Sequence, residues 1–149
     1  MKHKRILIVE DNPVLGRLEC RMQRLVDPDS EPNVVNDGLQ ALHLIERQSF
    51  DLVITDLSMP LVNGHELYLR TKTLCMIESR QVPRFIFCSG VQSALSGIAK
   101  HCAGGENRML LKPFSEKQFA DAVKELFLLS DMEDKAETPL ETLNEVLVR

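Results

Sequence analysis

Five charged or hydroxyl-bearing residues stand directly after, or at the end of, short apolar runs of strand length. Glu10 and Asp11 follow the first run, Asp56 ends a second, and Ser89 and Lys112 follow two others. Ligands of open α/β sheets bind outside the carboxyl ends of the strands. We therefore expect three carboxylates, a hydroxyl and an ammonium group to converge at one site.

This set of side chains predicts phosphoryl transfer assisted by a divalent cation. Clustered carboxylates repel one another, so a cation is their natural partner, and oxygen ligands alone suit Mg²⁺ or Mn²⁺. The hydroxyl and the ammonium group would supply donors to a phosphoryl group, whose transfer depends mostly on positioning and charge neutralisation. The glycine-rich nucleotide loops are absent. We expect the phosphoryl group to come from a small molecule or another protein, and an aspartate to accept it as an aspartyl phosphate.

The elements that must position these residues alternate between strands and helices. The segments between the strands carry apolar residues at helical spacing, and the first such set consists of Val14, Leu18, Met22 and Leu25. Nearly continuous apolar strands indicate a parallel sheet covered on both faces, so the prediction is a doubly wound α/β fold. The predicted strands are 5–9, 33–36, 52–55, 85–88 and 109–111, and the helix starts are marked by Asn12-Pro13, Asp37-Gly38, Asn63-Gly64 and the capping box of Ser115 with Gln118.

Five segments of the chain carry recognisable motifs in a fixed order. They are 6–12 (Ile-Leu-Ile-Val-Glu-Asp-Asn), 37–38 (Asp-Gly), 51–64 with Asp-Leu-Ser-Met-Pro-Leu-Val-Asn-Gly from residue 56, 88–90 (Cys-Ser-Gly) and 111–114 (Leu-Lys-Pro-Phe). Together these segments resemble the receiver domain of two-component response regulators, of the stand-alone, chemotaxis-regulator type. The resemblance spans about residues 4–129, and it implies a flavodoxin-like fold with five strands in the order 2-1-3-4-5 and helices on both faces.

The resemblance implies a role for each carboxylate. Asp56 would be the phosphoacceptor, and Glu10, Asp11 and Asp56 would hold Mg²⁺ (or Mn²⁺), with the backbone carbonyl of Ser58 as a further ligand. Glutamate at position 10 replaces the family's more frequent aspartate, and we expect it to serve the ion through water.

The resemblance also implies a switch. Ser89 would turn its hydroxyl toward the phosphoryl group, Lys112 would pair with that group, and the Lys112-Pro113 peptide bond would be cis. Met109 stands where the family has an aromatic switch residue. Methionine is flexible and can repack, but the usual coupled rearrangement of the hydroxyl and the aromatic ring is then in doubt.

Composition limits the class of protein. The chain has 149 residues, 44% hydrophobic and 27% charged, with net charge −4, as expected of one globular domain that as a whole binds neither nucleic acid nor anionic membranes. The absence of a signal-peptide or membrane-spanning apolar run favours a cytoplasmic protein. The cysteines are interpreted as reduced thiols and the histidines (His3, His43, His65 and His101) as surface or core-edge residues, since none has a metal partner in helical register.

The domain prediction is a receiver over residues 1–130 and, over 131–149, an acidic linker with a short amphipathic helix. That helix would start at Thr138-Pro139 and carry Leu140, Leu143 and Leu147. It would pack back on its own domain or mediate binding to a partner or a homodimer. No effector domain fits in this length, so no direct DNA binding is expected.

The predicted function is that of a response regulator. It would take a phosphoryl group from a sensor histidine kinase or phosphotransfer protein onto Asp56 and signal by contact with a downstream protein. We expect it not to be an enzyme, since it would catalyse only phosphotransfer to, and hydrolysis from, its own Asp56. One alternative is a phosphorylation-independent interaction module, which Met109 favours. The other is a Mg²⁺-dependent phosphatase with an aspartyl nucleophile, but such enzymes usually carry a second aspartate where this chain has Ser58.

Overall fold

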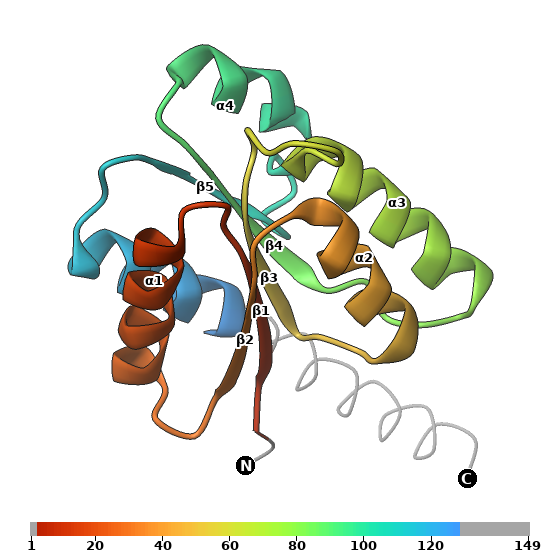
Figure 1. Ribbon diagram of the computed structural model, residues 1–149, viewed down its shortest axis with the longest axis horizontal. Helices are drawn as coiled ribbons and strands as arrows, with labels where there is room; N and C mark the ends of the chain where they lie inside the picture. The colour runs from red at the N-terminus through yellow and green to blue at the C-terminus, as the bar shows by residue number, and fades with distance from the viewer. Residues whose placement is uncertain (1–2, 129–149) are drawn as a thin grey trace, which may run out of the picture.

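The structure is a computed structural model that describes residues 3–128. A five-stranded parallel sheet in the order β2-β1-β3-β4-β5 forms its centre (Figure 1). The strands are β1 (Arg5–Val9), β2 (Glu31–Val35), β3 (Leu52–Asp56), β4 (Arg84–Ser89) and β5 (Arg108–Leu111). The helices are α1 (Pro13–Val26), α2 (Gly38–Arg47), α3 (Gly64–Ile77), α4 (Gln92–Ile98), the 3₁₀ turn η1 (Ala99–His101) and a last helix over 116–128 at the end of the described residues.

The predicted doubly wound fold, with its strand order, is confirmed. β1 pairs in parallel with β2 on one side and β3 on the other, so the strand order reverses at β1. Crossovers to either side of such a switch point leave a crevice above the carboxyl ends of the two central strands. Residues 10, 11 and 56 stand at these ends.

Helices cover both faces of the sheet because its strands are apolar on both sides. In β1, Leu7 and Val9 pack with residues of α2, α3 and α4, whereas Ile6 and Ile8 pack with α1 and the last helix (Figure 1). All four side chains are fully buried. Burying an aliphatic side chain of this size stabilises the fold by roughly 1.5–3 kcal/mol, so the two layers hold the sheet rigidly beneath the crevice.

The predicted capping residues begin four of the helices. Asn12, Asp37 and Asn63 each accept hydrogen bonds from backbone N–H groups of the following turn. Ser115 and Gln118 form the reciprocal capping box, with distances of 3.1 and 2.8 Å. Each cap contributes about 0.5–2 kcal/mol and fixes the residue at which its helix begins, close to a strand end.

The apolar stripe predicted for the first helix is mostly exposed, although α1 begins at the predicted Asn12-Pro13. Val14, Leu18 and Leu25 are exposed, and Met22 is the one member of the stripe that is buried. The helix instead turns Gly16 to the sheet, where an added Cβ would lie 3.1 Å from Val34 Cγ1. This close approach leaves little room for a larger residue at position 16, and the apolar stripe lies mostly away from the sheet. The buried residues of α1 are Gly16, Glu19, Met22 and Gln23.

Three further predictions concern the second strand, the cysteines and membrane-spanning helices. β2 starts earlier than predicted and includes Pro32, which an edge strand accepts because its missing N–H breaks no central ladder. The four cysteines are free, as predicted. Among residues 3–128, none of the helices combines the length and apolar character needed to cross a bilayer. The predicted linker and helix of 131–149 lie outside the described residues.

Candidate functional site

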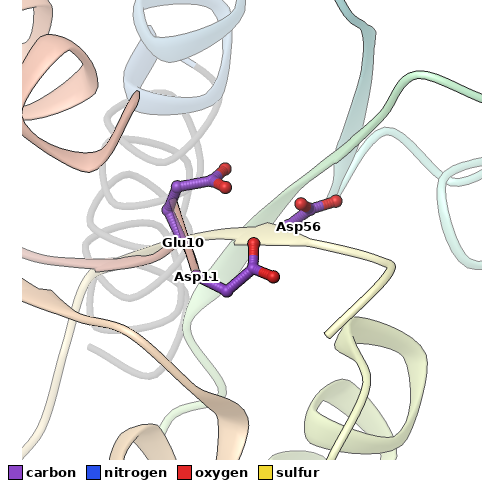
Figure 2. Close-up of side chains that lie close together, drawn as sticks. All are labelled: Glu10, Asp11 and Asp56. Atoms are coloured by element: carbon purple, nitrogen blue, oxygen red, sulfur yellow. The ribbon is translucent and has the colours of Figure 1, made fainter. Parts of the chain in front are cut away.

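The three predicted carboxylates meet at the crevice. Glu10 and Asp11 directly follow β1 and Asp56 ends β3, and one oxygen from each lies within 4.8 Å of the others. Figure 2 shows the three side chains facing a common space from two neighbouring strands. Glu10 is buried, Asp56 is half-buried and Asp11 is exposed. The site is therefore open on the side of Asp11 and closed behind Glu10.

Lys112 supplies one positive charge to this group. Its Nζ donates to Glu10 Oε2 at 2.7 Å and to Asp56 Oδ2 at 3.2 Å. Burial alone would lower the pKa of Lys112, but the hydrogen bond to Glu10 and the charges of Asp56 and Glu10 outweigh it and raise the pKa above its ordinary value. Lys112 is thus held as an ammonium group between two carboxylates.

Glu10 is the most buried of the three carboxylates. Burial raises its pKa, the hydrogen bond and charge of Lys112 lower it in part, and the charge of Asp56 raises it further. The backbone N–H of Asn12 donates to Glu10 Oε1 at 3.2 Å and holds the carboxylate toward the crevice.

The donor set fits Mg²⁺ or Mn²⁺. Three carboxylates face one ammonium group, so the described site carries excess negative charge that a divalent cation would offset. All the ligand atoms are oxygens, which hard cations prefer. Glu10, Asp11 and Asp56 would hold the ion, and the Ser58 carbonyl ligand remains a prediction. The backbone N–H of Ser58 donates to Asp56 Oδ1 at 3.3 Å, which places Ser58 beside the Asp56 carboxylate.

Ser89 is placed beside Asp56 and Lys112 by the sheet register. Cys88 pairs with Asp56 and Ser89 with Leu111, so the ends of β3, β4 and β5 lie side by side. The Ser89 side chain is buried, and its Oγ accepts a hydrogen bond of 3.0 Å from the Val91 backbone N–H at the start of α4. The Ser89 hydroxyl oxygen therefore accepts a hydrogen bond from the turn that directly follows it.

The loop after Asp56 is held by close backbone contacts. A Cβ on Gly64 would lie 2.4 Å from the Asp56 carbonyl oxygen, and a Cβ on Gly38 would lie 2.2 Å from the Val62 carbonyl oxygen. Both positions require glycine because the backbones touch. This explains why two motif segments far apart in the sequence each contain a glycine directly after a capping residue.

Two further predicted features of the site are the Lys112-Pro113 peptide bond and the side chain of Met109. The Lys112-Pro113 peptide bond is cis, as predicted. Met109 lies on β5 with 39% of its surface exposed, so the position assigned to the aromatic switch holds a solvent-accessible thioether side chain.

One residue that the sequence interpretation missed is Glu19. It is 3% exposed on the inner face of α1 and lines a groove of about 370 Å³ with Lys112, Pro113 and Phe114. Burial, together with the charges of Glu10 and Asp56, raises the pKa of Glu19 to about 8, against the opposing charge of Lys112. A glutamate within an apparently amphipathic helix gives no sequence signal of burial, and only the orientation of α1 places it inside.

The fold is a doubly wound α/β domain with an acidic site at the carboxyl ends of its central strands, and the comparisons with known proteins assign the family. Residues 6–124 match the response regulator receiver domain, and the chain belongs to this family. It is 30% identical over 123 residues to "Probable transcriptional regulator ycf29" of Pyropia yezoensis, covering 82% of this chain and 52% of that protein. It is 28% identical over 126 residues to the hybrid signal transduction histidine kinase K of Dictyostelium discoideum, covering 80% of this chain and 10% of that protein.

A solved structure agrees with this assignment. The bacteriophytochrome response regulator RtBRR superposes with a TM-score of 0.69 at 27% identity, covering 84% of this chain and 78% of that one. The match with this chain spans about half the length of the Pyropia yezoensis regulator and about a tenth of the Dictyostelium discoideum kinase. A receiver domain of two-component signalling is the shared unit.

Proposed function

We propose that this receiver is controlled by phosphorylation of Asp56 in a Mg²⁺-dependent reaction and signals by protein contact. The observation that supports the proposal is the convergence of Glu10, Asp11 and Asp56 within 4.8 Å, with Lys112 bridging two of them. A structural carboxylate at a strand end would need neither the acidic neighbours nor the half-buried ammonium group of Lys112.

The proposed step moves one phosphoryl group. A carboxylate oxygen of Asp56 attacks phosphorus, the P–N bond of a phosphohistidine donor breaks, and its electron pair returns to the imidazole nitrogen, which takes up a proton. Mg²⁺ held by the carboxylates would supply the positive charge that offsets the phosphoryl oxygens. Lys112 Nζ, already 3.2 Å from Asp56, would donate to a second phosphoryl oxygen.

Ser89 would convert this step into a change at α4. Turning its hydroxyl toward the phosphoryl group removes the acceptor of the Val91 N–H, and Val91 is the residue that precedes α4. Switching of this kind needs a coupling of about 1–3 kcal/mol between phosphorylation and the arrangement of the turn.

The partners follow from the same chemistry. Several curated relatives are sensor or hybrid histidine kinases, which supports a histidine kinase or phosphotransfer protein as donor. We propose that the chain catalyses only the reactions of its own Asp56 and passes the signal to another protein. Exposed Met109 on β5 supports a second candidate, a receiver that binds its target without phosphorylation.

Acetyl phosphate with Mg²⁺ tests the proposal, with intact mass as the readout. The wild type and an Asp29→Asn control, which alters an exposed carboxylate between α1 and β2, should gain one phosphoryl group, and Asp56→Asn should gain none. Labelling that persists in Asp56→Asn would overturn the assignment of the acceptor. A wild type that stays unlabelled would favour the interaction module, and repeated turnover of phosphomonoesters would favour a phosphatase.

A further inference from the structure

Two histidines from distant parts of the chain face each other outside the acidic site. His65 lies in the first turn of α3, and His101 ends η1, 36 residues later. Their Nε2 atoms are 3.1 Å apart, with ring centroids 5.1 Å apart and the ring planes tilted by 49°. Both residues are half-buried, so the pair can be reached from solvent. Helical register could not reveal this pair because its members belong to different elements.

The surrounding structure holds His101 in place. The buried side chain of Asn107 donates from Nδ2 to the His101 carbonyl oxygen at 2.8 Å and accepts from the Phe85 backbone N–H at 2.8 Å. The Tyr68 ring packs against the His101 ring with centroids 5.0 Å apart and also meets Phe85 edge-on. Preorganised ligands favour metal binding, and here the Asn107 hydrogen bond fixes the backbone of His101 while the Tyr68 ring packs against its imidazole.

On this geometry we propose that His65 and His101 form a second metal site, specific for a transition-metal cation such as Zn²⁺. With Zn–N bonds of about 2.0–2.1 Å, two Nε2 atoms 3.1 Å apart subtend about 95–100° at the metal. This angle lies between the right angle of square-planar or octahedral sites and the wider tetrahedral one. The lone pairs reach a shared ion through rotation of the imidazole rings, whose terminal torsions are broad. Water would complete the coordination.

The charges around the pair act in both directions. Lys72 from α3 and Lys100 from η1 oppose a cation, and Glu106, before β5, favours one. Burial, then His65, Lys100 and Lys72, lowers the pKa of His101, and Glu106 raises it in part. The lowered pKa favours the neutral form of His101, which has a lone pair on a ring nitrogen and is the form that binds metal.

The two sites differ in the ions they select. Paired imidazoles favour Zn²⁺, Cu²⁺ or Ni²⁺, whereas the carboxylates of the acidic site favour Mg²⁺ or Mn²⁺. A cation bound by the histidines would tie the first turn of α3 to the chain between α4 and β5. The proposal needs no phosphorylation and is independent of the function proposed for Asp56.

Zn²⁺ titration in excess Mg²⁺ tests the site, since Mg²⁺ competes for the carboxylates. The readout is the NMR shift of the ring nitrogens in the ¹⁵N-histidine-labelled chain. One equivalent of Zn²⁺ should shift the ring-nitrogen signals of both His65 and His101. His65→Gln or His101→Gln should weaken Zn²⁺ binding by at least about tenfold, because the loss of an outer-shell partner of a metal ligand already has an effect of about that size. The control is His43→Gln, which removes an exposed histidine of α2 and should bind like the wild type.

Three results would overturn the proposal. The first is that neither ring shifts, which would leave the pair as a hydrogen bond that shares a proton. The second is a shift of one ring alone, as for a single surface histidine. The third is an equal Zn²⁺ affinity in the wild type and both glutamine variants. The ring shifts of the wild type decide the matter even if a variant folds poorly.

Discussion

Replacing Glu19 by glutamine should reduce the pH dependence of folding stability. The Glu19 carboxyl is 3% exposed on α1, and its pKa is raised from 4.5 to about 8. The native state therefore binds this proton more tightly than the unfolded chain. The resulting contribution to the free energy of unfolding is fully present below pH 4.5 and is lost as the pH rises through about 8.

The size of the effect follows from the shift. One pKa unit corresponds to about 1.4 kcal/mol, so the displacement from 4.5 to about 8 allows a loss of at most about 5 kcal/mol. Glutamine has nearly the same shape and stays neutral at every pH. The variant should thus be comparable to the wild type near pH 5 and more stable by several kcal/mol near pH 9.

Urea unfolding in metal-free buffer from about pH 5 to pH 9 measures this difference by linear extrapolation. The buffer is metal-free because the charges of Glu10 and Asp56 also raise the pKa of Glu19. Glu46→Gln, at an exposed position of α2, is the matched control and should leave the pH profile of the wild type unchanged. A Glu19→Gln profile that runs parallel to the wild type would refute a buried, protonated carboxyl.

Three further substitutions test contacts that shape the fold and site, each by urea unfolding. Gly64→Ala places a Cβ 2.4 Å from the Asp56 carbonyl oxygen and should cost about 1–3 kcal/mol by overpacking; an unchanged midpoint would contradict the close approach. Asn107→Ala leaves the buried Phe85 N–H without its acceptor and should cost about 1–3 kcal/mol, whereas a neutral result would mean that another acceptor replaces it. Phe119→Ala removes a fully buried ring and should cost about 3–5 kcal/mol, and a cost below that of Gly64→Ala would argue against the packing of the last helix.

The fold could be predicted from the sequence wherever local and global signals agree. Strands such as β3 and β4 are continuous apolar runs, and Asn12, Asp37 and Asn63 are capping residues whose side chains accept the expected bonds. Because parallel strands bring their carboxyl ends to one edge, the convergence of Asp56 and Lys112 also follows from the pattern.

What could not be predicted depends on tertiary contacts. In α1 the side that faces the sheet holds Gly16, Glu19 and Gln23 beside Met22, and no apolar periodicity in the helix contains that information. Glu19 is buried as a consequence of this orientation. The pairing of His65 with His101 depends on how α3 and η1 are placed by different strands, so the spacing of the two residues in the sequence does not predict it.

The two core layers also determine how the thiols can be labelled. Half-buried Cys20 packs against the layer beneath α1, and half-buried Cys102 packs against the layer on the opposite face of the sheet, whereas Cys75 and Cys88 are buried. Burial, reinforced by the charge of Glu106, raises the pKa of Cys102 to about 11, so its reactive thiolate is scarce at neutral pH. A maleimide should therefore attach first to Cys20, which provides a fluorescent or spin label on α1 in the unaltered sequence.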